Sequence, residues 1–128
     1  MLIVEDNDQM RAALREFMRA AFPERTIHEA AACAAALAVV REHRPRLVLT
    51  DIDLPDANGI ALTAAIKALF PEIHVIVVTD FDEASYVQHA LSAGAFAYVT
   101  KDKIHTDLVP LARRALEAGA PRPPEAKP

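Results

Sequence analysis

The sequence has little of three things: cysteine, long hydrophobic runs and basic charge. Cys33 is the single cysteine in 128 residues, so an intrachain disulfide is excluded and the cytoplasm is the expected compartment. No cluster of His or Cys surrounds it in the sequence, which favours a small core residue over a metal thiolate. No apolar run is long enough to cross a bilayer, and the apolar start at Met1 is too short for a signal peptide. We therefore expect no contact with a membrane.

The scarcity of positive charge bears on the class of partner. Lys and Arg number 14 against 18 Asp and Glu, which gives a formal net charge of −4. A nucleic-acid surface needs an excess of basic side chains, so this mild acidity gives no support for direct nucleic-acid binding. Hydrophobic residues make up 52% and charged residues 25% of the chain, an ordinary balance for one globular domain of this length.

Short apolar runs alternate with amphipathic segments five times along the chain. The predicted strands are residues 2–4, 25–30, 47–49, 73–78 and 95–99. The predicted helices are residues 10–21, 31–44, 62–70, 82–93 and 107–116. Strict alternation predicts a doubly wound α/β fold, in which helices cover both faces of a five-stranded parallel sheet, (βα)5. Only the second strand alternates polar and apolar residues, which fits an edge and favours the strand order 2-1-3-4-5.

The fourth helix, the last helix and the C-terminal residues each have a distinct sequence feature. The fourth helix has the weakest apolar stripe, so we expect it to be the most mobile. Pro110 is compatible with a helix only in its first turn, which places the start of the last helix near Asp107. Four prolines in the last nine residues stop any further helix. We expect residues 1–119 to form one domain and residues 120–128 to be a Pro-rich linker or a disordered tail.

Four of the five predicted strands end in residues that carry chemistry. These are Glu5 and Asp6 after the first strand, Asp51 after the third, Thr79 at the end of the fourth and Lys101 after the fifth. Taken singly, each has a plain structural explanation as a cap, a turn former, a β-former or a surface lysine. The order 2-1-3-4-5, however, brings these strand ends to one crevice, at the switch point between the first and third strands. Four such ends in one crevice favour a functional site.

The chemistry of this group is that of phosphoryl transfer to an aspartate. Three neighbouring carboxylates repel one another and need a counter-charge. A hard divalent cation with oxygen ligands, Mg²⁺ or Mn²⁺, supplies it. Asp51 can then attack a phosphoryl group in line, while the cation, Lys101 and Thr79 hold its equatorial oxygens.

These residues, with three neighbouring motifs, resemble the signature of response-regulator receiver domains of two-component signalling, the CheY-like superfamily with a flavodoxin-like fold. The matching residues are Glu5-Asp6, Asp51 with Leu54-Pro55 and Asn58-Gly59, Thr79, Tyr98 and Lys101. The resemblance extends from Leu2 to about Gly119.

The resemblance implies a role for each matching residue. Asp51 is the expected phosphoacceptor, and Thr79 and Lys101 are the expected phosphoryl contacts. The expected metal ligands are Glu5, Asp6, Asp51 and the backbone carbonyl of Asp53. Thr79 and Tyr98 form the expected switch pair, which biases the fourth helix and its flanks between two arrangements.

Three positions depart from the usual receiver pattern. Asp80 follows Thr79, where a small residue is usual, so we expect it to alter phosphorylation or dephosphorylation rates. Asp53, two residues beyond the phosphoacceptor, is expected to influence hydrolysis of the acyl phosphate. Asp102 replaces the Pro that follows the Lys in many receivers, which resembles the LuxR or NarL branch with helix-turn-helix outputs.

The resemblance also implies partners. We expect a sensor histidine kinase as phosphoryl donor, a homodimer on phosphorylation, and a C-terminal DNA-binding output domain that this chain lacks. The signal is expected to leave through the face made by the fourth helix, the fifth strand and the last helix. The chain would catalyse its own phosphorylation and dephosphorylation without being a turnover enzyme.

Two other functions remain open at this point. A pseudo-receiver would use the same fold as a binding scaffold and would never be phosphorylated. This alternative stays open because Asp80 stands where receivers usually have a small residue. A haloacid-dehalogenase-like phosphatase also carries an Asp-x-Asp pair after a strand, as in Asp51-Ile52-Asp53. Against it, Pro55 stands where that motif has Thr or Val, and no acidic strand end follows Lys101.

Overall fold

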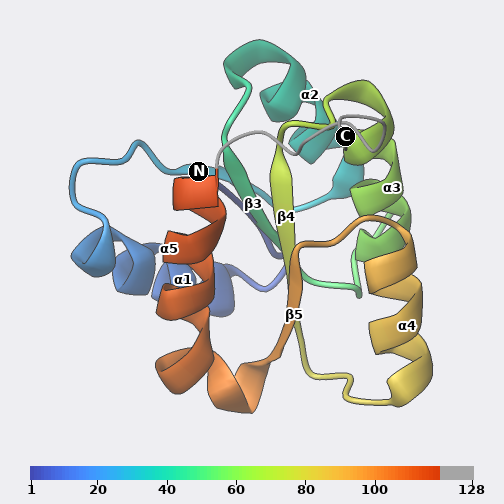
Figure 1. Cartoon of the computed structure of the whole chain (residues 1–128). Helices are drawn as coiled ribbons and strands as arrows, with labels where there is room; N and C mark the ends of the chain where they lie inside the picture. Colours follow the sequence, from blue (N-terminus) through green and yellow to red (C-terminus); the bar gives the residue numbers. More distant parts are fainter. Residues whose placement is uncertain (119–128) are drawn as a thin grey trace, which may run out of the picture.

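A single parallel sheet organises the chain in the computed structural model, which describes residues 1–118 (Figure 1). Its strands are β1 (Leu2–Val4), β2 (His28–Ala30), β3 (Leu47–Thr50), β4 (His74–Thr79) and β5 (Ala97–Thr100). The helices are α1 (Asp8–Ala21), α2 (Cys33–His43), α3 (Gly59–Leu69), α4 (Ala84–Ser92) and α5 (Val109–Ala118). The strand order is β2-β1-β3-β4-β5, with every pair parallel, so the predicted fold and strand order are confirmed. The predicted domain boundary at residue 119 and the tail of residues 120–128 lie outside the described residues.

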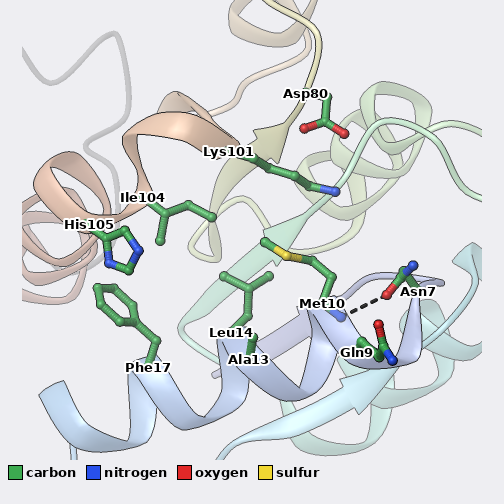
Figure 2. Close-up of a pocket in the computed structure, with 10 residues that line it drawn as sticks. All are labelled: Asn7, Gln9, Met10, Ala13, Leu14, Phe17, Asp80, Lys101, Ile104 and His105. Atoms are coloured by element: carbon green, nitrogen blue, oxygen red, sulfur yellow. Dashed lines mark hydrogen bonds between the residues drawn. The ribbon is translucent and has the colours of Figure 1, made fainter.

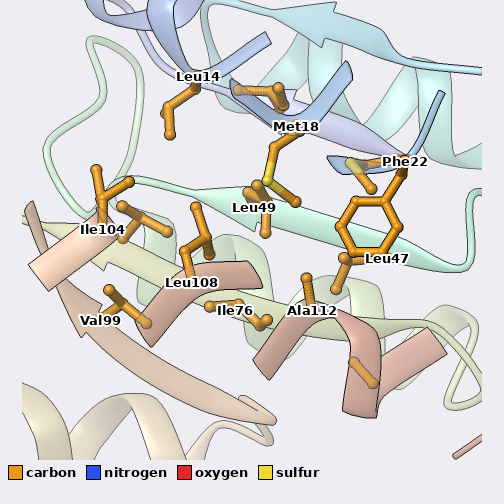
Figure 3. Close-up of a cluster of buried hydrophobic side chains, with 14 of the residues drawn as sticks. Leu14, Met18, Phe22, Leu47, Leu49, Ile76, Val99, Ile104, Leu108 and Ala112 are labelled. Carbon is orange, nitrogen blue, oxygen red and sulfur yellow. The ribbon is translucent and has the colours of Figure 1, made fainter. Parts of the chain in front are cut away.

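The helices cover the two faces of the sheet unequally, α1 and α5 on one face and α2, α3 and α4 on the other (Figure 1). Successive strand residues point to opposite faces, so Ile3 packs toward α1 and α5 while Leu2 and Val4 pack toward α2 and α3. Figure 3 shows the buried hydrophobic cluster on the α1 and α5 face of the sheet, in which Met18 of α1 and Leu108 pack over the strands. Each such side chain, fully buried, contributes roughly 1.5–3 kcal/mol of transfer free energy.

Two strands are shorter than predicted. β2 pairs only from His28, because the chain before it is still turning, with the amide of Arg25 donating to the carbonyl of Phe22. β5 starts at Ala97, because the residues before it end α4. There Gly94 has a φ of 106° and the amide of Ala95 donates to the carbonyl of Ala90.

The last helix starts differently from the prediction near Asp107. A 3₁₀ turn, η1 (Lys101–Lys103), and a π-helical turn, η2 (Ile104–Leu108), precede α5, which begins at Val109. Pro110 has no amide hydrogen for a regular helical bond to Thr106, and a wider turn before it accommodates this loss. The helical path therefore begins directly after the fifth strand.

Helix α4 has the smallest anchor among the helices of residues 1–118. Ala90 is its single buried residue, and Leu91 is 49% exposed. The weak apolar stripe expected from the sequence is therefore seen in the packing, while the mobility of α4 stays a prediction. No helix in the described part of the chain is long and apolar enough to span a membrane.

Candidate functional site

The candidate site is built on the rigid carboxyl ends of the strands. The amide of Glu5 donates to the carbonyl of Ala30 at 3.0 Å, and the amide of Asp51 donates to the carbonyl of Val4 at 3.1 Å. Both acids thus leave the sheet from backbone that is still part of its hydrogen-bond ladder. The side chains of Glu5 and Asp51 are 2% and 8% exposed, an unusual degree of burial for carboxylates.

Lys101 joins the two buried acids. Its Nζ lies 2.9 Å from Oε1 of Glu5 and 3.0 Å from Oδ2 of Asp51. With Asp51 it forms an aligned hydrogen bond, whereas Oε1 of Glu5 is buried and has no aligned donor in residues 1–118. The three side chains come from the ends of β1, β3 and β5, and their predicted convergence is confirmed.

The second oxygen of Asp51 is held by the loop that follows it. Oδ1 accepts a hydrogen bond from the amide of Ile52 at 2.7 Å and a longer one from the amide of Asp53 at 3.5 Å. One carboxylate oxygen therefore faces Lys101 while the other is fixed by backbone donors. This arrangement sets the orientation of the carboxylate before any ligand arrives.

Burial and charge act on these groups in opposite directions. Burial raises the pKa of Glu5 above its ordinary value, against the opposing effects of Lys101 and of the Asn7 amide, which donates to Oε2 at 3.1 Å. Burial alone would lower the pKa of Lys101, but its interactions with Glu5 and Asp51 outweigh it and raise that pKa. Lys101 is therefore positively charged at neutral pH.

The two remaining residues of the predicted metal site lie at the surface. Asp6, the third predicted carboxylate ligand, is exposed, and Asp53, which is expected to contribute its backbone carbonyl, is exposed too and forms an isolated antiparallel bridge with Asn58. Within residues 1–118, no three His, Cys, Asp or Glu side chains come close enough together to hold a metal ion. The ammonium of Lys101 occupies the position between Glu5 and Asp51, and it supplies the counter-charge that the carboxylates need.

The predicted switch residues both hydrogen-bond to the backbone of one residue in the β4–α4 loop, Phe81. Thr79 is fully buried, and its Oγ1 accepts from the amide of Phe81 at 3.5 Å. The hydroxyl of Tyr98 donates to the carbonyl of Phe81. Burial, with the nearby charges of Glu83 and Asp82, raises the pKa of Tyr98 to about 12. The hydroxyl stays protonated at neutral pH and remains a donor.

Asp80 lies on an open groove beside the site (Figure 2). The groove has a volume of about 700 Å³ and is bordered at one end by Asp80 and Lys101. From there it runs along α1 past Met10 and Leu14 to Phe17, which packs edge-on against His105 with ring centroids 5.5 Å apart. Its apolar floor thus leads directly to the ammonium of Lys101.

Sequence reasoning found the Asn58-Gly59 pair but missed what Gly59 does. A Cβ at Gly59 would stand 1.8 Å from the carbonyl oxygen of Asp51, so only glycine fits there. It also missed Asp56, whose carboxylate bonds to the first amides of α2. An uncapped helix start at Ala32 was the one signal for this contact in the sequence.

Comparison with known proteins agrees with this fold. The family model for the response regulator receiver domain matches residues 1–120. The transcriptional regulatory protein YhcZ of Bacillus subtilis is 37% identical over 110 residues, which is 85% of this chain and 51% of YhcZ. The response regulator protein VraR of Staphylococcus aureus is 29% identical over 114 residues, 89% of this chain and 54% of VraR.

Solved structures show the same likeness. A LuxR-family two-component response regulator from Aurantimonas has a TM-score of 0.82 at 25% identity, covering 97% of this chain and 89% of that one. The receiver domain of NtrX from Brucella abortus has a TM-score of 0.82 at 28% identity, covering 91% and 97%. The chain belongs to the response regulator receiver domain family of two-component systems. It spans about half the length of the curated relatives that it matches.

Proposed function

We propose that Asp51 accepts a phosphoryl group from the phosphohistidine of a sensor histidine kinase, in a reaction that depends on Mg²⁺ or Mn²⁺. The observation that carries this proposal is the contact of one protonated lysine, Lys101, with two buried carboxylates, Glu5 and Asp51. Burying a carboxylate without a partner costs free energy, and buried ionisable groups cluster at functional sites. A lysine paired with two buried carboxylates is therefore a candidate functional site.

The chemical step uses the carboxylate of Asp51 as nucleophile. One of its oxygens forms the new O–P bond while the N–P bond of the donor breaks, and the histidine nitrogen leaves with the bonding electrons. Lys101 is already within ion-pair distance of Asp51 and can follow the added negative charge. Water later attacks the phosphorus, which releases phosphate and restores Asp51.

The donor set of the site fits a hard divalent cation. Every candidate ligand is an oxygen: the carboxylates of Glu5, Asp6 and Asp51 and the backbone carbonyl of Asp53. Oε1 of Glu5 is a buried acceptor that meets the Lys101 ammonium at 2.9 Å without an aligned hydrogen bond, so a divalent cation would share this carboxylate with Lys101. Such a cation would supply charge neutralisation between the acids and the incoming phosphoryl oxygens.

The proposed switch couples Asp51 to the least anchored helix. Thr79 and Tyr98 both bond to Phe81, so a move of the Thr79 hydroxyl toward a phosphoryl group on Asp51 alters the loop that leads into α4. The signal would then leave through the α4-β5-α5 face. Asp53 and Asp80 are exposed at the rim of the site, where their negative charge would modulate the rates of phosphoryl transfer and hydrolysis.

The names of the relatives support a wider role in transcription. YhcZ is described as a transcriptional regulatory protein, and the Aurantimonas protein as a LuxR-family regulator. We propose a cytoplasmic regulator in which this domain governs a C-terminal DNA-binding domain, with phosphorylation favouring a homodimer. In this arrangement the chain is a phosphoryl acceptor and not a turnover enzyme.

Beryllofluoride binding tests the site directly, since this anion mimics a phosphoryl group on a carboxylate. With Mg²⁺ we expect saturable binding to the wild type, followed by ¹⁹F NMR, and none to Asp51→Asn. Absence of binding to the wild type would favour a pseudo-receiver. Repeated turnover of a phosphate monoester would instead favour the phosphatase.

A further inference from the structure

Helix α2 begins without a cap of its own. The residue at its N-cap, Ala32, has an extended backbone but only a methyl side chain, and the first turn contains no acidic residue. By contrast, α1 and α3 have caps from Asn7 and Asn58, whose side chains accept from amides in their first turns. An uncapped start leaves backbone donors without partners.

Asp56 fills this vacancy from another part of the chain. Its Oδ1 accepts from the amide of Cys33 at 2.8 Å, and its Oδ2 accepts from the amide of Ala34 at 3.0 Å. These backbone bonds lower the pKa of Asp56, which stays ionised at neutral pH. A carboxylate at a helix start also interacts favourably with the helix dipole.

The loop that carries Asp56 is the one that presents the phosphoacceptor. Residues 51–58 run from Asp51 to the cap of α3, and the base of the loop is closed by the amide of Gly59, which donates to the carbonyl of Ile52 at 2.8 Å. The isolated bridge between residues 53 and 58 narrows it. Asp56 lies near its exposed tip, so its two bonds fasten the far end of the loop to α2.

We propose that Asp56 is a positioning residue, which holds the loop of residues 51–58 so that the Asp53 carbonyl and the Asp51 carboxylate are ready for a divalent cation. This inference rests on the proposed function. A ligand carried on a loose loop has to be ordered each time the cation binds, and that ordering costs affinity. Loss of Asp56 is therefore expected to weaken cation binding more than the chemical step at saturating cation.

Three variants separate this role from general stability. Asp56→Ala removes both acceptors, whereas Asp56→Asn keeps one acceptor oxygen and loses the charge. Val40→Ala removes buried side-chain atoms from the same helix and leaves both acceptors of Asp56 in place, so it controls for a loss of stability alone.

The first measurement is amide hydrogen exchange on the metal-free proteins. We expect Asp56→Ala to accelerate exchange at Ile52 and Asp53, the amides that donate to Asp51, with Asp56→Asn intermediate. Val40→Ala should change the exchange rates of these two amides no more than those of the strand amides. Equal protection of the loop in the wild type and Asp56→Ala would overturn the proposal.

The second measurement is calorimetric titration with Mg²⁺, joined to the Mg²⁺ dependence of phosphorylation by acetyl phosphate. We expect Asp56→Ala, which removes two hydrogen bonds, to raise both the dissociation constant and the half-saturating Mg²⁺ roughly two- to tenfold, a change of the size that a single hydrogen bond contributes net. The maximal rate should change little. A fall in maximal rate with unchanged Mg²⁺ affinity would overturn the proposal. A wild type that neither binds Mg²⁺ nor gains phosphate would instead refute the proposed function.

Discussion

Replacement of Gly59 by Ala tests the packing beneath the phosphoacceptor. The new Cβ would stand 1.8 Å from the carbonyl oxygen and 2.8 Å from the carbonyl carbon of Asp51. Both atoms belong to backbone, which cannot turn aside as a flexible side chain can. The start of α3 or the end of β3 must therefore shift by about 1 Å or more.

The cost of this shift follows from what it disturbs. Forcing atoms into a packed site costs about 1–3 kcal/mol, and the bond from the Gly59 amide to the Ile52 carbonyl would weaken as well. At about 4 °C per kcal/mol for a domain of this size, we expect the melting temperature to fall by about 10 °C. Because Asp51 moves with its carbonyl, phosphorylation should slow too.

Gly94→Ala provides the matched control. There the new Cβ would meet Cγ of Lys67 at 2.9 Å, a flexible side chain, and the positive φ of 106° adds backbone strain. We expect a loss of stability from this variant with a normal phosphorylation rate. Melting curves and acetyl phosphate kinetics on both variants show whether the loss of stability is accompanied by slower phosphorylation. If Gly59→Ala melted and reacted like the wild type, the close approach of α3 to Asp51 would be refuted.

Three further predictions concern the metal, the thiol and the rim of the site. Mg²⁺ should raise the melting temperature of the wild type and act less on Glu5→Gln, because it relieves repulsion among the acids; a melt indifferent to Mg²⁺ would count against the cation site. Burial raises the pKa of Cys33 to about 11, so iodoacetamide should alkylate it slowly at pH 8, faster as the pH rises toward 11, and fast in urea; rapid native reaction at pH 8 would contradict its burial. Asp80→Ala should change the rate of phosphorylation, measured with acetyl phosphate, or the rate of dephosphorylation, measured as loss of the phosphoryl group over time. If both rates were unchanged, Asp80 would not be a modulator.

The fold was predictable because its signals are local and repeated. Apolar runs and helix periods each depend on a few adjacent residues, and their alternation defines the sheet. Convergence of Glu5, Asp51 and Lys101 then followed from strand order alone, without any knowledge of side-chain positions.

The missed features depend on contacts that no local pattern carries. Asp56 reaches amides 22 and 23 residues earlier in the chain, and the need for Gly59 arises from a backbone approach across the loop. The metal site stays a prediction: Asp6 is exposed, and no three His, Cys, Asp or Glu side chains within residues 1–118 come close enough together to hold a metal ion. Sequence placed the acids at one edge of the sheet, but packing decided which of them are buried.

Intact-mass measurement shows directly whether the strand ends form a phosphoryl-accepting site at Asp51. The wild type, treated with acetyl phosphate and Mg²⁺, is expected to gain the mass of one phosphoryl group, and Asp51→Asn is expected to gain none. Equal labelling of both proteins, or no labelling of the wild type, would exclude Asp51 as the phosphoryl acceptor.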